Sequence, residues 1–302
     1  MNFPKTPILV IFFNRPTILA SLLQSLEKFK PTELFFACDG ARSDVDQANI
    51  MACINIIKEK ISWVCTVKTY SSEKNYGCDT FVPKAIDWFF SQVESGIILE
   101  DDCLISEEFY MFASELIIKY FNDHRVMNIS APNFQLQKWG VADYYFSIYP
   151  LNWGWATWRR AWNLYDASLK DIDILYGQFN FPDSFNLEEK RYWVRFFRGL
   201  HAGKYTYWDA KWVYSMWKNG GISISPNVNL SSNIGFGESA THTKKKLYKH
   251  NLPIEKIQKP LRHPSDVKCS YPDADRFQFL NSYRPTWIGR FNAFVAKVKS
   301  IL

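Results

Sequence analysis

The fold of this chain is decided by one stretch, Gly96-Ile97-Ile98-Leu99-Glu100-Asp101-Asp102. A short apolar run bounded by glycine is typical of a buried β-strand. Three carboxylates follow at its C-terminal end, which is the end where ligands bind in open α/β sheets. Three like charges in one place cost free energy unless a cation or hydrogen-bond donors compensate them. Hard oxygen ligands of this kind suit Mg²⁺ or Mn²⁺, although a solvated acidic turn is the simpler alternative.

Strand-like and helix-like segments alternate around this stretch in the first half of the chain. Pro16 is placed to open the first helix, and Ser43 or Asp44 to cap the second. The predicted strands are 7–13, 34–38, 63–70, 96–99 and 126–130, and the predicted helices are 16–26, 43–60, 78–93 and 107–121. This alternation predicts an α/β fold with a mostly parallel, doubly wound sheet.

The regular alternation of strands and helices ends after Pro132, where aromatic segments of mixed character follow. Helices are predicted over 156–165, 187–201 and 210–218, and a strand over 222–225 leads into a polar loop. No repeat, low-complexity tract or clear linker separates the halves, so we expect them to share one core.

Composition limits the class of protein. The chain has 302 residues, and 47% of them are hydrophobic, too many for a disordered protein. Aromatic residues make up 17%, which leaves rings beyond the core for a site that covers the faces of sugars. The six cysteines form no CxxC pair and no Cys/His cluster, which disfavours zinc and a disulfide framework. Reduced thiols are typical of a cytoplasmic protein.

The two ends of the chain differ in character. The start, MNFPKTPILVIFF, lacks a basic segment and a small-residue cleavage site, so we expect no signal peptide. No apolar stretch reaches the roughly 18 residues of a membrane span. From Lys244 onward, 13 basic residues accompany 4 acidic ones, a net charge of +9. Such a segment suits an anionic surface or substrate, or is a solvated tail.

An amphipathic helix is predicted near the C-terminus. Its apolar positions recur at helical spacing with Arg290, Lys297 and Lys299 between them, and they are Trp287, Ile288, Phe291, Phe294, Val295 and Val298. This helix is compatible with peripheral contact with an anionic membrane. It is equally compatible with packing on the rest of the chain or with a homodimer interface.

Polar residues follow the first two predicted strands. Phe13-Asn14-Arg15 comes after the first and Asp39 after the second, so we expect them to converge with the acidic triplet. Asn14 and Asp39 suit a base or ribose, and Arg15 suits a phosphate, although these residue types also serve ordinary turns. The sequence contains no GxGxxG and no GxxxxGK[ST], which disfavours a dinucleotide-binding Rossmann domain and a P-loop NTPase.

The second half contributes aromatic residues and one carboxylate. Gly154 permits a tight bend between Trp153 and Trp155, which we predict to form part of a sugar-binding wall. Asp209 follows Trp208 just before a predicted helix. It is either a helix N-cap or a general base whose pKa the neighbouring aromatic rings raise.

A glycine-bearing loop follows the last predicted strand. It reads NIGFGESATHT over 233–243, and a loop of this kind can close over a substrate. His242 is either a surface residue or a contact for a diphosphate or metal, and the lysines at 244–246 favour contact with an anion.

In their order along the chain, these segments resemble the nucleotide-diphospho-sugar transferases. More narrowly, they resemble bacterial relatives of the Golgi N-acetylglucosaminyltransferase that starts complex N-glycans. The resemblance covers roughly residues 7–243 and rests on PILVIFFNRP, Asp39, KNYG, IILEDD, NWGW, WDAKW and FGESATHT. It implies a glycosyltransferase-A fold with a nucleotide-sugar-binding α/β half at 1–130. Residues 131–246 would form the acceptor-side and catalytic half of the same domain, and 247–302 a basic extension.

The resemblance also implies roles for individual residues. Asp102 would be the direct ligand of Mn²⁺ or Mg²⁺, and Asp209 the catalytic base, although the Golgi enzymes have WDDW where this chain has WDAKW. Asp39 would contact uracil. The other expected nucleotide-sugar contacts are Phe13, Asn14, Arg15, Asn75, Tyr76, Glu100, Asp101 and His242. The expected sugar wall consists of Trp153, Trp155 and Trp208.

The implied activity is that of an inverting, metal-dependent glycosyltransferase. It would move a hexosyl or N-acetylhexosaminyl group from a nucleotide-diphosphate sugar, with UDP favoured, to a hydroxyl of a glycan or lipid-linked acceptor. The setting would be bacterial surface polysaccharide synthesis, in the cytoplasm or at the inner face of the membrane, without a nucleic-acid partner. Two alternatives remain open. A non-catalytic carbohydrate-binding protein would leave the carboxylates idle, and a sugar nucleotidyltransferase would want glycines that PILVIFFNRP lacks.

Overall fold

The computed structural model describes residues 5–172, 185–235 and 252–283. Strands and helices alternate through the first half of the chain, as the sequence predicts. These elements are β1 (Ile8–Phe12), α1 (Pro16–Glu27), β2 (Glu33–Cys38), α2 (Asp44–Lys60), β3 (Thr66–Ser71), α3 (Cys78–Phe90), β4 (Ser95–Glu100), β5 (Cys103–Ile105), α4 (Glu107–Lys119) and β6 (Val126–Ser130). The later elements are β7 (Tyr144–Ser147), β8 (Trp155–Trp158), α5 (Arg159–Trp162), α6 (Leu187–His201), α7 (Trp208–Lys218), β9 (Ile222–Pro226), β10 (Ser231–Asn233) and α8 (Pro272–Ser282).

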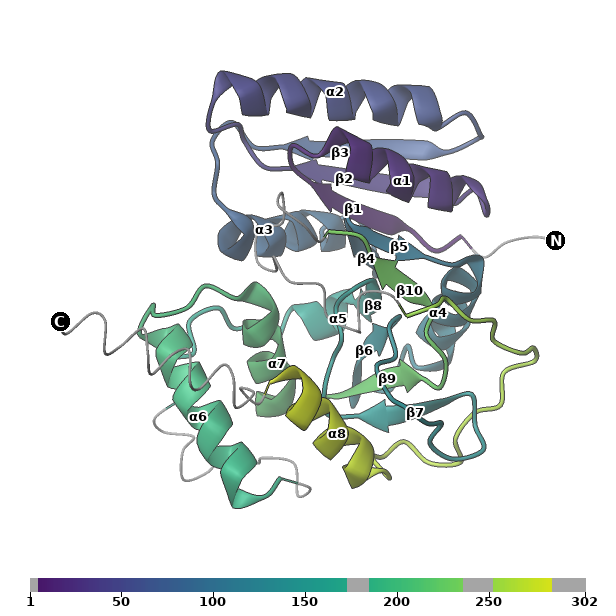
Figure 1. Ribbon diagram of the computed structural model, residues 1–302, viewed down its shortest axis with the longest axis vertical. Coiled ribbons are helices and arrows are strands. Elements are labelled where there is room, and N and C mark those ends of the chain that lie inside the picture. The colour runs from purple at the N-terminus through teal and green to yellow at the C-terminus, as the bar shows by residue number, and fades with distance from the viewer. Residues whose placement is uncertain (1–4, 173–184, 236–251, 284–302) are drawn as a thin grey trace.

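One eight-stranded sheet runs through the molecule in the order β3-β2-β1-β4-β8-β6-β9-β7 (Figure 1). β3, β2, β1 and β4 pair in parallel, and β6 and β9 do the same. β8 lies antiparallel between β4 and β6, and β7 is an antiparallel edge strand. Most strands therefore point the same way, which confirms the predicted α/β class with a mostly parallel sheet.

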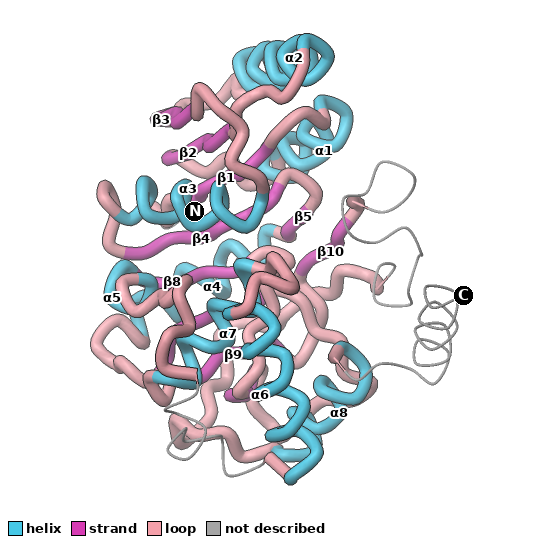
Figure 2. Tube along the Cα trace, turned by 90° about the vertical axis from the view of Figure 1, so that its left-hand side faces the viewer, coloured by secondary structure: helices cyan, strands magenta, loops and turns pink. Residues whose placement is uncertain are grey.

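Helices cover both faces of the sheet, so the sheet is doubly wound. Successive side chains of a strand point to opposite faces. Ile8 and Val10 of β1 accordingly join a core that includes side chains of α1, α2 and α4. Leu9 and Ile11 join a second core with α3, α6 and α7. In Figure 2, β1–β3, α1 and α2 occupy one half of the molecule, and α6, α7 and α8 group in the other.

The predicted helix over residues 156–165 is wrong at its start. The structure has the strand β8 at Trp155–Trp158, and only the short α5 follows it. β8 pairs with a strand on either side and is buried along its whole length. A short apolar run that is buried on all sides has no periodicity that distinguishes a strand from a helix. The two neighbouring strands therefore decide its conformation.

The described part of the basic C-terminal segment packs on the body of the molecule. Phe279 of α8 is buried in the second core, and Asp275 accepts a hydrogen bond of 2.6 Å from Ser147 Oγ of β7. Arg276 forms ion pairs with Glu188 and Glu189 of α6. The amphipathic helix predicted near 287–298 lies outside the described residues, and the domain boundaries at 130 and 246 stay predictions.

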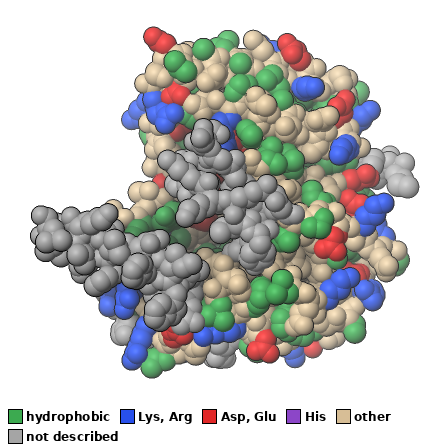
Figure 3. All heavy atoms as spheres, viewed as in Figure 1, with side chains coloured by type: hydrophobic (Ala, Val, Ile, Leu, Met, Phe, Trp, Pro, Cys, Tyr) green, Lys and Arg blue, Asp and Glu red, His purple; other side chains and the backbone are tan. Residues whose placement is uncertain are grey.

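The described residues on one face of the molecule carry side chains of both charges (Figure 3). On the face in Figure 3, basic and acidic side chains of the described residues are interspersed. Among the helices that the structure describes, none has the length and apolar character needed to cross a bilayer.

Candidate active site

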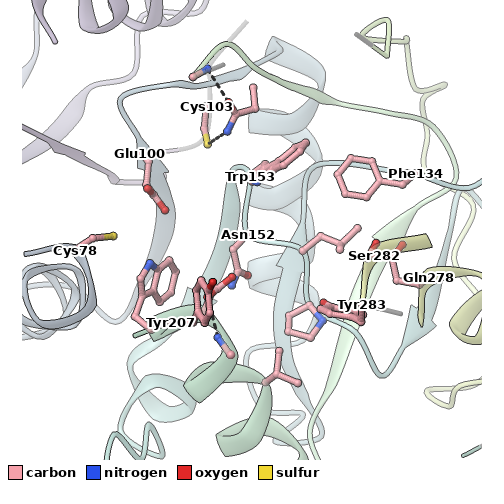
Figure 4. A pocket seen from close by; sticks show the side chains of 18 of the residues that line it. Cys78, Glu100, Cys103, Phe134, Asn152, Trp153, Tyr207, Gln278, Ser282 and Tyr283 are labelled. Atoms are coloured by element: carbon pink, nitrogen blue, oxygen red, sulfur yellow. Dashed lines mark hydrogen bonds between the residues drawn. The ribbon is translucent and has the colours of Figure 1, made fainter. Parts of the chain in front are cut away.

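A cavity of about 550 Å³ lies between the carboxyl end of β4 and the helices α6, α7 and α8. Arg15, Glu100 and Asp102 line it from the sheet, and residues 150–153 line it as well. In Figure 4, Glu100 and Cys78 lie on one side, Gln278 and Ser282 on the other, and Asn152 between them. The predicted residues that line it are Arg15, Glu100, Asp102, Trp153, Trp208 and Asp209. The fold thus brings the predicted strand-end residues and Asp209 to one cavity.

One guanidinium compensates two of the three carboxylates. Arg15 Nη2 lies 2.9 Å from Asp102 Oδ2, and the same group forms two hydrogen bonds with Asp101. Asp101 is buried behind the cavity, whereas the side chain of Asp102 is 13% exposed. Because Arg15 itself lines the cavity, its fork is within reach of an anion bound there.

A second strand pair holds Asp102 from the other side. β10 pairs with β5, placing Asn233 opposite Cys103, and this pairing was not predicted. Asn233 Nδ2 donates to Asp102 Oδ1 at 3.2 Å, and the Ile234 N–H donates to the Asp102 carbonyl at 2.9 Å. A Cβ at Gly235 would overlap Asp102 Oδ2, so a larger residue here would displace the Asp102 side chain. The start of the 233–243 loop is therefore fastened at Asp102, while His242 lies outside the described residues.

The residues around Asp102 fit a divalent cation that it would share with a substrate. Carboxylate oxygens are hard ligands that Mg²⁺ and Mn²⁺ prefer. Within the described ranges, no group of three or more His, Cys, Asp or Glu side chains is arranged to hold a metal ion. Asp102 would thus supply one ligand, and substrate oxygens and water would have to supply the others.

Burial raises the pKa of two members of the acidic triplet, Glu100 and Asp101. Burial, followed by repulsion from Asp102, Asp101 and Asp209, raises the pKa of Glu100 to about 8. Burial also raises the pKa of Asp101 to about 6, although Arg15 opposes this shift. A cation bound beside the triplet would favour the ionised forms of Glu100 and Asp101 and would lower both pKa values.

Asp209 approaches the same cavity from the first turn of α7. Tyr207 occupies the N-cap position of this helix, so the interpretation of Asp209 as the N-cap residue is wrong. A carboxylate in the first turn is favoured by the helix dipole, and Asp209 accepts a 2.9 Å hydrogen bond from the Ala210 N–H. Lys211 forms an ion pair of 2.6 Å with Asp79 of α3, which ties the start of α7 to the sheet half. Asp209 is exposed to the cavity.

Asp39 and Asn75 build a turn beside the cavity and do not line it. The Asp39 carboxylate is buried and accepts hydrogen bonds from the backbone N–H groups of Tyr76 and Gly77, the latter at 2.8 Å. Asn75 Nδ2 donates to the Gly40 carbonyl at 2.8 Å. These two residues therefore position the turn that opens α3.

Phe13, Asn14 and Tyr76 also lie outside the cavity lining. The Arg42 guanidinium stands 4.8 Å from the centre of the Phe13 ring, and Asn14 Nδ2 donates to Asp46. Lys74 and Lys84 lie within 4.9 Å of the centre of the Tyr76 ring. The expected contacts of these residues with a nucleotide stay predictions.

The expected aromatic wall is only partly formed by the predicted residues. Trp153 lines the cavity and packs edge-on against Phe134 at 5.1 Å. Trp155 is 1% exposed and packs in the core against Trp162, Trp208 and Trp212. A side chain buried in this way cannot contact a sugar, so the prediction for Trp155 is wrong. Trp155 is the first residue of β8 and its side chain lies in the second core, whereas Trp153 belongs to the segment before the strand.

Other lining residues were not predicted. α6 contributes Tyr192 and Phe196, the residue before α7 contributes Tyr207, and the end of α8 contributes Gln278, Ser282 and Tyr283. The sequence carries a weak signal for α6, since its rings recur four residues apart on one helix face. No local pattern indicates that α8 returns to the cavity from a distant part of the chain.

Comparisons with known proteins assign no family and no reaction to this chain. No family model matches the sequence, and no curated protein matches it either. Among solved structures, the mannosyltransferase PcManGT from Pyrobaculum calidifontis, in complex with GDP-Man and Mn²⁺, is 10% identical, with 72% of this chain and 69% of that chain covered at a TM-score of 0.37. HddC from Yersinia pseudotuberculosis is 8% identical, with 51% of this chain and 77% of that chain covered at a TM-score of 0.34. The bifunctional glycosyltransferase WbbM is 11% identical, with 71% of this chain and 37% of that chain covered at a TM-score of 0.35. Likeness at this level does not specify a reaction.

Proposed function

We propose that this chain is a metal-dependent, inverting glycosyltransferase that uses a nucleotide-diphosphate sugar, with a UDP-sugar favoured. One observation carries the proposal: Arg15, Asp102 and Asp209 line the same cavity together with aromatic side chains. A cation-binding carboxylate, a phosphate-binding cation and a second carboxylate are the groups that such a transfer requires.

The donor would bind at the strand end. Asp102 would hold Mn²⁺ or Mg²⁺ against the diphosphate, and the ion would supply a Lewis acid that stabilises the leaving group. Arg15 is positioned to leave Asp102 for a phosphate oxygen, since it contacts both Asp101 and Asp102 and reaches the cavity. The two Arg15 contacts to Asp101 would then keep the guanidinium in place.

The acceptor would bind at the helix side. Asp209 would take the proton of the acceptor hydroxyl while that oxygen attacks the anomeric carbon on the face opposite the diphosphate. No covalent intermediate with the protein is needed, so positioning and electrostatics would account for most of the rate. The exposure of Asp209 to the cavity supports this role, because a base must reach the hydroxyl that it deprotonates.

The finer assignments belong to the same proposal. The transferred group would be a hexosyl or N-acetylhexosaminyl group, and the acceptor a glycan or a lipid-linked glycan of a bacterial surface polysaccharide. The enzyme would work in the cytoplasm or at the inner face of the membrane, where peripheral membrane contact or a homodimer would involve the C-terminal residues.

A hydrolysis screen tests this function. The purified chain is incubated with UDP-, GDP- and CDP-sugars in the presence of Mn²⁺, Mg²⁺ or a chelator, and the released nucleotide is measured. We expect metal-dependent hydrolysis of a UDP-sugar that Asp102→Asn removes. Metal-dependent formation of a nucleotide sugar from a sugar phosphate and a triphosphate would instead identify a nucleotidyltransferase. Sugar binding without any turnover would identify a carbohydrate-binding protein.

A further inference from the structure

The two oxygens of the Asp102 carboxylate have different surroundings. Oδ1 accepts hydrogen bonds from Asn233 Nδ2 at 3.2 Å and from Cys103 Sγ at 3.4 Å. Among the residues that the structure describes, Oδ2 accepts a hydrogen bond from Arg15 Nη2 alone, at 2.9 Å. A carboxylate oxygen has about two lone-pair sites, so two donors occupy both sites of Oδ1. Oδ1 is therefore closed to a further ligand, whereas Oδ2 keeps a free site.

The Asn233 amide is held in place by the backbone around it. β10 pairs with β5, and this register places Asn233 opposite Cys103, the residue that directly follows Asp102. The Gly235 N–H donates to Asn233 Oδ1 at 2.8 Å, which fixes the orientation of the amide and directs its Nδ2 toward Asp102. The Ile234 N–H donates to the Asp102 carbonyl at 2.9 Å. A ligand at Oδ2 would leave all of these contacts in place.

Gly235 keeps the space beside the other oxygen clear. A Cβ at this position would overlap Asp102 Oδ2, and both residues line the cavity. Arg15 can leave Oδ2 without losing its place, since it also forms two hydrogen bonds with Asp101. The Asp102 carboxylate therefore offers one oxygen to a ligand in the cavity.

The number of carboxylate oxygens that a site offers affects which cation it binds. Ca²⁺ takes roughly six to eight oxygen ligands at about 2.3–2.6 Å, and carboxylates often bind it through both oxygens. Mg²⁺ requires nearly octahedral geometry at about 2.0–2.1 Å and usually keeps several waters, and Mn²⁺ also takes octahedral oxygen sites. A carboxylate with one closed oxygen therefore suits Mg²⁺ and Mn²⁺ better than Ca²⁺.

We infer that Asn233 determines the cation selectivity of this site, because it reserves Oδ2 of Asp102 for the ion and so favours Mn²⁺ and Mg²⁺ over Ca²⁺. This inference rests on the proposed function and adds a specificity-determining residue to it. Asn233 would act through Asp102, so it is a positioning residue. Removal of a hydrogen-bond partner of a ligating side chain commonly lowers metal affinity by roughly 10–100-fold.

Calorimetry of UDP with different cations tests this selectivity. UDP is titrated into the full chain with saturating Mn²⁺, Mg²⁺ or Ca²⁺ and without a divalent cation, and the gain in UDP affinity from each cation is measured. In the native chain, we expect the gains from Mn²⁺ and Mg²⁺ to exceed the gain from Ca²⁺ by roughly tenfold. A gain from Ca²⁺ that equals or exceeds the gain from Mn²⁺ would overturn the inference.

Replacement of Asn233 tests the residue itself. We expect Asn233→Ala to lower the gains from Mn²⁺ and Mg²⁺ by roughly tenfold, and to leave the gain from Ca²⁺ unchanged or raised, because a site on Oδ1 becomes free. A merely structural role would lower all three gains together and would leave their ratio as it is in the native chain. An unchanged ratio of the Mn²⁺ gain to the Ca²⁺ gain would therefore contradict the role of Asn233.

Two further variants provide a second test and a matched control. Cys103→Ala removes the other donor to Oδ1, so we expect it to shift the ratio in the same direction. Ser232 lies in the same strand and pairs with Leu104, so Ser232→Ala should leave all three gains unchanged. If Ser232→Ala shifted the ratio as much as Asn233→Ala, the effect would belong to the strand and the inference would be wrong.

Failure of the inference and failure of the proposed function give different results. If the chain hydrolyses a UDP-sugar with a metal but Asn233→Ala keeps the native ratio, the selectivity role is wrong and the function stands. If the cations act in the expected ratio but no nucleotide sugar is hydrolysed, the selectivity role stands and the transferase function is wrong. If no cation raises the UDP affinity of the native chain, both are wrong.

Discussion

Arg15 and Asp102 determine the electrostatics of the strand end of the cavity. The guanidinium contacts Asp101 and Asp102 together, and the 2.9 Å contact with Asp102 is the one that faces the cavity. Burial, reinforced by repulsion from Asp102 and Asp101, raises the pKa of Glu100 to about 8, and the single Arg15 guanidinium pairs with both Asp101 and Asp102. A substrate that arrives with a divalent cation would favour the ionised form of Glu100.

Replacing Asp209 tests the general base. We expect Asp209→Asn to keep UDP binding and to lower turnover by roughly 10²–10⁴, the range for loss of a general base. The free energy of unfolding should change little, because Tyr207 and not Asp209 occupies the N-cap position of α7. Steady-state turnover and UDP affinity of the variant are measured side by side. Loss of stability with turnover intact would indicate that Asp209 has a structural role in the first turn.

Among the secondary-structure elements, α8 is fastened to β7 by the buried carboxyl group of Asp275. Burial raises the pKa of Asp275 to about 7, and Oδ2 has no hydrogen-bond partner among the described residues. The folded protein therefore holds a proton up to about pH 7 that the unfolded chain loses above about pH 4. The unfolded state binds fewer protons in this window, so the free energy of unfolding falls as the pH rises through it.

Asp275→Asn is expected to remove this pH dependence. The amide cannot ionise but can still accept the Ser147 hydrogen bond, so the variant should be more stable than the native chain above pH 7. The advantage over the native chain should grow by up to about 4 kcal/mol between pH 4 and pH 8. Urea unfolding at pH 4.5, 6 and 8 measures it. A variant that is less stable than the native chain at pH 8 would contradict the buried protonated carboxyl.

The sequence predicts those elements whose burial follows from a local pattern. Prediction fails for strands whose pairing partners lie far away in the sequence. Apolar runs and helix caps predict β1, β2, β4 and their helices. The parallel sheet predicts that Arg15 and Asp102 lie close together. The sequence predicts a helix over most of β8 because a strand with neighbours on both sides is apolar throughout. The β10–β5 pair was missed because its register depends on residues more than 120 positions apart.

The same limit applies to the site. The strand-end residues and Asp209 carry their chemistry in the sequence, so they could be proposed before the fold was known. Trp155 and Trp153 look alike in the sequence, and only the direction of β8 shows that one is core and the other lines the cavity. The contribution of α8 depends on how residues 252–283 return to the sheet, which no local pattern encodes.

At the scale of the whole molecule, the cavity is assembled from both halves and from the C-terminal segment. Arg15 belongs to the first strand–helix unit, Asp209 to α7, and Tyr283 follows α8. The relative position of donor and acceptor groups therefore depends on the shared core between α3, α6 and α7. A change in that core far from the cavity would move the two halves of the site relative to each other.

Contact with an anionic membrane is one of the alternatives that the sequence leaves open for the residues beyond Tyr283. Basic residues near such a surface contribute about 1 kcal/mol each, and Arg290, Lys297 and Lys299 lie in the predicted amphipathic helix. In sedimentation with anionic vesicles, the membrane alternative predicts that the full chain binds and that a chain ending at Tyr283 loses most of that binding while keeping its affinity for UDP. Equal sedimentation of both chains would reject the membrane contact.

The central claim is that Asp102 carries a divalent cation which binds the nucleotide diphosphate. Calorimetric titration of UDP with and without Mn²⁺, on the native chain and on Asp102→Ala, tests it most directly. We expect Mn²⁺ to raise the UDP affinity of the native chain by at least roughly tenfold, and the folded variant to lose this gain. Equal UDP affinity of the native chain with and without Mn²⁺, or a gain that Asp102→Ala retains in full, would contradict the claim.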